Sequence, residues 1–93
     1  QDAQILDVQP NPFSHETTFR FVLPKAEDVT LTITDAQGRE VALQKISAHA
    51  GLNTAIWNGR SDTGGWLASG VYVVRLQTTA GSFNKKVMLQ RIP

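Results

Sequence analysis

The chain has 93 residues, which is room for one domain, and we treat residues 1–93 as a single unit. Nine basic and eight acidic side chains give a formal net charge of +1, which argues against a nucleic-acid binder because such proteins carry a clustered basic excess. The sequence has no cysteine and no run of about 18 apolar residues, so it excludes a disulfide scaffold, a cysteine nucleophile and a membrane-spanning helix.

The first third of the chain predicts two strands separated by prolines. Residues 4–9 and 17–23 show the alternation of apolar and polar side chains that is typical of half-buried strands. Pro10 and Pro12 interrupt this pattern, because proline lacks the amide hydrogen that a ladder needs and restricts the residue before it. Pro24 ends the second strand.

The middle of the chain predicts a hairpin and a further strand. In residues 29–35 apolar side chains alternate with threonines, so one face of this strand is expected in the core and the other in solvent. Residues 35–38, with the sequence DAQG, are typical of a type I turn followed by a left-handed glycine, and they lead into a strand at 39–46. The next strand is predicted at 53–57.

The last third begins with a long glycine-rich connection, residues 58–70. The strand at 71–79 is apolar on both faces near its start, which is typical of a central strand. A turn at 79–81 joins it to the final strand at 82–91. Seven short strands with regular turn signals predict an all-β fold, a seven-stranded antiparallel immunoglobulin-like β-sandwich.

The two tryptophans could form a sugar-stacking face, as in a carbohydrate-binding module. Trp57 shares its strand face with Ala55, so a buried anchor is the favoured interpretation. Trp66 lies in the glycine-rich connection, and we expect it to fold back as a plug over one end of the sandwich because so small a core needs the area.

No set of residues in the sequence stands out as a metal or catalytic site. His15 and His49 are the only histidines, and they lie in separate predicted loops without further ligands at zinc spacing. Residues 58–64 are rich in oxygen donors but lack the glutamate and acidic spacing of an EF-hand, so a tight turn is favoured over a calcium loop. We therefore expect no metal, no cofactor and no enzymatic activity.

Four motifs follow one another in an order that resembles a known family. They are QPNPFSHETTFRFVLP at 9–24, VTLTITDAQGREV at 29–41, AIWNGRSDTGGWLASGVYVVRL at 55–76 and NKKVMLQR at 84–91. Together they resemble the type A C-terminal sorting domain of the type IX secretion system of Bacteroidota-type bacteria. Segments 35–41 and 57–72 are also similar to the immunoglobulin-like domain of the flagellar hook-capping protein. The opening Pro-Asn-Pro element and the basic last strand favour the sorting family, whereas the ending QRIP departs from its usual lysine-terminated tail.

The resemblance implies a targeting role. Such domains follow an N-terminal cargo domain of the same chain and are recognised in the periplasm by the type IX secretion translocon. The cargo then crosses the outer membrane to the cell surface or the extracellular medium. A sortase-like peptidase removes the domain, and cleavage is expected near or before residues 1–4. We expect a monomer that has no nucleic-acid partner.

The final hairpin is where we place the recognition surface, with Gly70, Tyr72, Arg75, Lys85 and Lys86 as the candidate translocon-binding residues. A receptor can read such a hairpin by side-chain contact or by strand addition. Tyr72 also fits the apolar alternation, and core packing is the favoured interpretation for it. The lysines are expected to be exposed because nothing in the pattern buries them. Two other functions stay open: a carbohydrate-binding or spacer module of a secreted glycoside hydrolase, and a hook-cap assembly domain.

Overall fold

The computed structural model describes residues 2–91 and contains seven strands. In chain order they are β1 (Gln4–Gln9), β2 (Thr17–Leu23), β3 (Glu27–Thr34), β4 (Glu40–Ala48), β5 (Gly51–Trp57), β6 (Gly70–Thr78) and β7 (Gly81–Leu89). Each predicted strand is confirmed, and every bound lies within two residues of the predicted one. The expected cleavage segment at residues 1–4 lies partly outside the described residues, and the unusual tail residue Pro93 lies wholly outside them.

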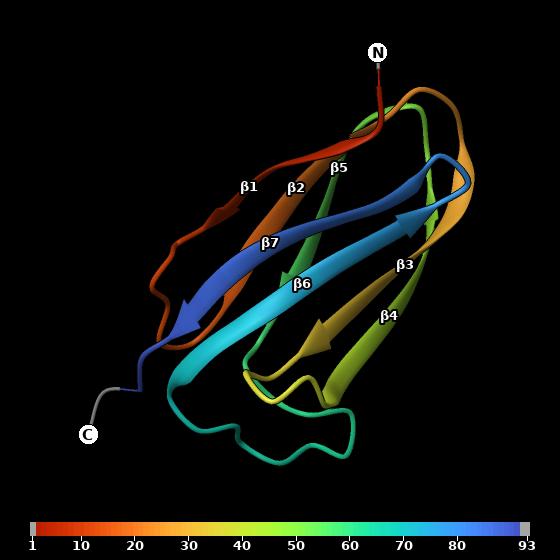
Figure 1. Ribbon diagram of the computed structural model, residues 1–93. Coiled ribbons are helices and arrows are strands. Elements are labelled where there is room, and N and C mark those ends of the chain that lie inside the picture. The colour runs from red at the N-terminus through yellow and green to blue at the C-terminus, as the bar shows by residue number, and fades with distance from the viewer. Residues whose placement is uncertain (1, 92–93) are drawn as a thin grey trace.

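The strands form two antiparallel sheets that face each other, as the predicted immunoglobulin-like sandwich requires (Figure 1). The three-stranded sheet has the order β1-β2-β5, and the four-stranded sheet has the order β4-β3-β6-β7. β6 pairs with β3 on one side and with β7 on the other, which confirms the prediction of a central strand. No helix that could cross a membrane occurs in residues 2–91.

The core lies between the sheets and consists of side chains that alternate along the strands. Because neighbouring residues of a strand point to opposite faces, every second side chain enters this layer. The largest core side chains expose no more than 2% of their surface: Phe13 from the segment between β1 and β2, and from the strands Phe19, Phe21, Leu23, Leu31, Ile33, Val74, Leu76, Val87 and Leu89. Trp57 exposes 3% and is the buried anchor that the sequence predicts.

The two ends of the sandwich differ in their connections (Figure 1). At one end, which we call the tight-turn end, short turns at residues 24–26, 49–50 and 79–80 join the strands. The other end, which we call the loop end, gathers residues 10–16, 35–39, 58–69 and 90–91. The N-terminal part of the described chain lies at the tight-turn end, and its C-terminal part lies at the loop end.

The turn between β3 and β4 has the predicted form. Gly38 has a φ of 86° and donates its amide hydrogen to the Asp35 carbonyl at 3.0 Å. The Asp35 carboxylate accepts hydrogen bonds from the amides of Arg39 at 2.9 Å and Gln37 at 3.0 Å. The Arg39 amide and guanidinium, with help from the Gln37 amide, hold the pKa of Asp35 below its ordinary value.

Candidate functional site

The predicted recognition surface falls on the β6–β7 hairpin. Its two strands pair along their whole length, from Gly70 opposite Leu89 to Thr78 opposite Gly81. β7 is an edge strand of the four-stranded sheet and lies side by side with β1 of the other sheet (Figure 1). The hairpin therefore has three exposed parts: the outer face of β6 and β7, part of the edge of β7, and the turn that joins the two strands.

Three of the candidate residues form an exposed basic group on this hairpin. Arg75 lies opposite Asn84, and its Nε donates a hydrogen bond to Asn84 Oδ1 at 3.3 Å. Lys86 lies on the same outer face, opposite Val73. Lys85, opposite Val74, belongs to the inward-facing set by alternation, but its side chain is exposed. We refer to Arg75, Lys85 and Lys86 as the basic cluster.

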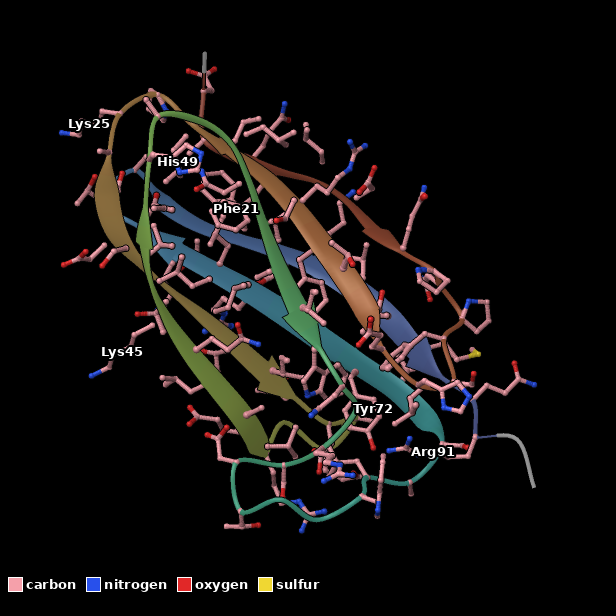
Figure 2. The ribbon with its side chains drawn as sticks, turned by 180° about the vertical axis from the view of Figure 1, so that it is seen from behind. Phe21, Lys25, Lys45, His49, Tyr72 and Arg91 are labelled. Carbon is pink, nitrogen blue, oxygen red and sulfur yellow. The ribbon has the colours of Figure 1, made fainter. Side chains whose placement is uncertain are left out.

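Tyr72 lies in the core, which confirms the interpretation favoured for it and removes it from the exposed part of the candidate surface. Only 5% of its surface is exposed, and its ring meets the edge of Trp57 with centroids 5.4 Å apart. Its hydroxyl donates a hydrogen bond to the Ala68 carbonyl at 2.6 Å, and burial raises the pKa of Tyr72. The apolar alternation of β6 directs this ring into the core, so Tyr72 packs the loop end from inside (Figure 2). Gly70 is exposed at the first position of β6.

The edge of β7 is partly covered by the segment between β1 and β2. Phe13 donates its amide hydrogen to the Met88 carbonyl at 3.0 Å, and its carbonyl accepts one from Gln90 at 2.8 Å. The Asn11 side chain accepts a hydrogen bond from the Met88 amide at 2.9 Å and donates one to the Lys86 carbonyl at 3.4 Å. The sequence indicated only that this proline-flanked segment breaks a strand; its role as a cover for the last strand was missed.

Trp66 is exposed over 63% of its surface, so the expectation that it plugs one end of the sandwich is wrong. The guanidinium of Arg60 lies 3.7 Å from its ring centroid, and that of Arg91 lies 4.8 Å from it. The buried aromatic surface at this end of the core comes instead from Trp57, which packs against Phe13 at a ring-centroid distance of 5.4 Å. With that end already filled, Trp66 stacks with the two arginines on the outside.

Arg91 connects the end of β7 to two loops (Figure 2). Its guanidinium donates hydrogen bonds to the carbonyls of Gly59 at 2.7 Å, Leu67 at 3.1 Å and Ser14 at 3.2 Å. A Cβ added at Gly59, where φ is 74°, would lie 3.1 Å from Arg91 Nη2. The sequence carried no signal for this role, because the partners are backbone carbonyls that no residue pattern marks.

Side-chain oxygens of residues 58–64 accept hydrogen bonds from backbone amides, both within the loop and on β4. Asn58 Oδ1 accepts a hydrogen bond from the Arg60 amide at 3.1 Å, and both Asp62 carboxylate oxygens accept one from the Leu43 amide, at 3.2 and 3.1 Å. Asp62 therefore covers part of the edge of β4. Across residues 2–91, no group of three or more His, Cys, Asp or Glu side chains is placed to hold a metal ion.

Comparison with known proteins gives one family and several similar structures. A family model described as the FlgD Ig-like domain matches residues 11–82. No curated protein sequence matches the chain. The structure is similar to dimeric latent PorU from Porphyromonas gingivalis, with 24% identity and a TM-score of 0.76 over 97% of this chain and 9% of that one. It is also similar to PorZ of the same organism, described as an essential bacterial surface component of the type-IX secretion system, with 24% identity and a TM-score of 0.66 over 94% of this chain and 11% of that one.

A third similar structure is FlgD from P. aeruginosa, with 17% identity and a TM-score of 0.61 over 96% of this chain and 67% of that one. At these identities the likeness shows the shared fold. The chain spans about a tenth of the length of PorU and PorZ.

Proposed function

The chain belongs to the FlgD Ig-like domain family, and within that family we propose that it is a C-terminal sorting signal that directs exported cargo across the outer membrane through the type IX secretion system. The observation that carries this proposal is the exposed basic cluster on an edge hairpin of a fold that PorZ shares over 94% of this chain. The order of the four sequence motifs along the whole chain supports the same assignment.

In this proposal the domain is the signal by which the secretion system recognises the cargo, and it has no catalytic role. It passes through the periplasm with its cargo, is read there by the translocon, and ends at the cell surface or in the medium. A sortase-like peptidase cleaves ahead of β1, where the chain enters the tight-turn end. The start of β1 lies at the opposite end of the sandwich from the loop end, so cutting ahead of it does not touch the contacts of the loop end.

The test is a fusion of residues 1–93 to the C-terminus of a periplasmic reporter in a cell with a working type IX system. We expect the reporter in the medium or on the cell surface, and we expect it in the periplasm when Lys85 to Pro93 are deleted. The deletion also removes Val87 and Leu89 from the core, so export could fail because the domain unfolds.

A double variant, Lys85→Glu with Lys86→Glu, separates recognition from folding. Both lysines are exposed, and such substitutions typically change stability by only about 0.5 kcal/mol. We expect this variant to fold and to lose export. If the intact fusion stays in the periplasm while a known sorting domain exports the same reporter, the sorting function is wrong.

Assembly of the flagellar hook cap is the second candidate, because the family model and the FlgD structure both match most of this chain. Replacing the immunoglobulin-like domain of a hook-capping protein with residues 1–93 tests it directly. Restored hook assembly would favour this role over sorting.

A carbohydrate-binding role is the remaining alternative, and the exposure of Trp66 is the feature that favours it. Arg60 and Arg91 already stack against that ring, which leaves less of it for a sugar. We expect no saturable heat when the domain is titrated with soluble polysaccharides. Saturable binding that disappears in Trp66→Ala would move the assignment to a carbohydrate-binding module.

A further inference from the structure

One stretch of the β7 edge has no hydrogen-bonding partner among residues 2–91. The outward backbone groups of Met88 and the outward carbonyl of Lys86 are bonded by Phe13 and Asn11. Because backbone groups along a strand point to alternate sides, the amides and carbonyls of Asn84 and Ser82 face the same edge. Within the described chain, no segment or side chain bonds to the Lys86 amide or to the outward groups of Asn84 and Ser82. We call residues 82–86 the free edge.

The corresponding stretch of β4, at the opposite edge of the same sheet, has a different electrostatic setting. Asp62 bonds to Leu43 and Val41, which leaves the outward groups of Lys45 and Ser47 free by the same alternation. This stretch carries the basic Lys45, and Ser47 pairs with Asp28 of β3, so one basic and one acidic side chain lie here together. The free edge of β7 is instead next to the basic cluster.

The basic cluster has no acidic partner in the described part of the chain. The two ion pairs there join Arg20 to Asp7 and Arg39 to Asp35, and neither includes a cluster residue. Lys85 is close enough to Asp7 to contribute to lowering the pKa of that carboxyl, but the hydrogen bond from Arg20 is the main cause. The charge beside the free edge is therefore available to a ligand.

We propose that an extended segment with acidic side chains adds to the free edge as an additional strand of the four-stranded sheet. Main-chain hydrogen bonds to Asn84 and Lys86 supply the pairing, and charge complementarity with the basic cluster selects the segment. This inference rests on the proposed function, because it assumes that another protein reads the hairpin. Beyond side-chain contact, it specifies main-chain pairing with Asn84 and Lys86 and an acidic partner segment.

The geometry limits what the added strand can be. Asn11 and Phe13 already occupy the edge beyond Lys86, so pairing stops there and the strand spans about five residues. Its side chains alternate between the outer face, beside Arg75 and Lys86, and the inner side, beside Lys85 and the partly buried Phe83. A segment fits this edge if its acidic side chains lie on the outer face, beside Arg75 and Lys86, and its apolar side chains lie on the inner side, beside Phe83.

The probe is the blocked peptide acetyl-Thr-Glu-Val-Glu-Val-Glu-Thr-amide, added to the ¹⁵N-labelled domain, with a second peptide carrying lysine in place of each glutamate. Binding is followed by amide chemical shifts and hydrogen exchange. At saturation we expect the amides of Asn84 and Lys86 to exchange about tenfold more slowly, since each gains a hydrogen bond. The lysine peptide is expected not to bind.

Two proline variants locate the added strand. Asn84→Pro removes an outward amide hydrogen from the free edge, and Ser47→Pro removes one from the free stretch of β4. Proline is tolerated on an edge strand when the lost hydrogen faces solvent, so both variants are expected to fold, which thermal unfolding verifies. Binding lost in Asn84→Pro and kept in Ser47→Pro supports the proposal.

The proposal is overturned if the glutamate peptide does not bind, if it protects amides of β4 instead, or if both peptides bind equally. Peptide binding is measured on the domain alone and does not depend on secretion. Export of the fusion by a domain that binds no acidic strand would therefore reject strand addition and leave the sorting function standing. Strand binding by a domain that is not exported would reject only the sorting function.

Discussion

The loop end and the tight-turn end of the sandwich are held by interactions of different range. At the tight-turn end, the buried Asn53 side chain bonds to the backbone of His49 and Gly51, all within four residues. At the loop end, Arg91 bonds to the carbonyl of Ser14, 77 residues earlier, and Asn11 bonds to Met88 across the same separation. Among residues 2–91, one residue pair links the tight-turn end over such a range: the amide and hydroxyl of Thr79 donate hydrogen bonds to the Glu27 carboxylate.

The two ends also differ in whether their strand edges are covered. Near the loop end, β7 is covered by residues 11–13 and β4 by Asp62. Nearer the tight-turn end the edges of both strands lack such covers within the described residues. An uncovered edge is a template for pairing with another chain. The long-range links therefore hold the loop end together, and the uncovered half of β7 is the stretch to which our proposal assigns strand addition.

The largest effect is expected from Trp57→Ala at the loop end. This side chain packs against Phe13 and Tyr72 and donates its indole hydrogen to the Arg60 carbonyl at 3.0 Å. Its removal is expected to lower the free energy of unfolding by about 3–5 kcal/mol, measured by urea denaturation. Leu52→Ala, on the exposed face of the same strand, is the control with little effect. Unchanged cooperative unfolding in Trp57→Ala would contradict the packing described for this end.

Arg91→Ala is expected to cost about 2 kcal/mol, because hydrogen bonds from a charged donor to three carbonyls are lost. Residues 58–69 should also become more sensitive to limited proteolysis. Arg91→Lys keeps the charge but not the forked geometry, so it should recover only a small part of the loss. Arg75→Ala, a change on the exposed hairpin face, should leave stability within about 0.5 kcal/mol of the original. Equal stability of all these variants would show that the loop end does not depend on Arg91.

Asn11→Ala is expected to cost about 1 kcal/mol and to lengthen the uncovered part of β7, since Asn11 bonds to both Met88 and Lys86. Light scattering at rising protein concentration should then show more self-association. Asn84→Ala, which removes a side chain from an edge that is already free, is the matched control and should show neither effect. If the Asn11 variant stays as monodisperse as the control, this side chain does not protect the edge.

The smallest effect concerns acid and the Asp35 turn. Because the folded pKa of Asp35 is lowered, its carboxylate contributes stability above its unfolded pKa of about 4, and this contribution is lost as the pH falls through the folded pKa. Asp35→Asn cannot titrate, so the stability difference between the original chain and this variant should be constant near neutral pH and shrink under acid conditions. A difference that does not change with pH would contradict the carboxylate's role in the turn.

The sequence by itself determined the elements that depend on local periodicity and turn chemistry. The alternation of Val29, Leu31 and Ile33 with threonines placed β3 and its buried face, because the period of a strand is a property of the backbone. Asp35 and Gly38 specified their turn because a carboxylate acceptor and a left-handed glycine are needed at those positions. The same local reasoning predicted that Trp57 is buried.

Only the tertiary structure decided what lies opposite each face and edge. The sequence predicted that Lys85 is exposed, but only the tertiary structure shows that this exposed side chain lies on the same strand side as the buried Val87. Trp66 stays outside, and that end of the core is filled by Trp57 packed against Phe13, a residue far from Trp66 in sequence. The cover of β7 by Asn11 and the links made by Arg91 join backbone groups that are distant along the chain. Backbone amides and carbonyls are identical at nearly every residue, so no residue pattern marks which of them a folded chain will bring together.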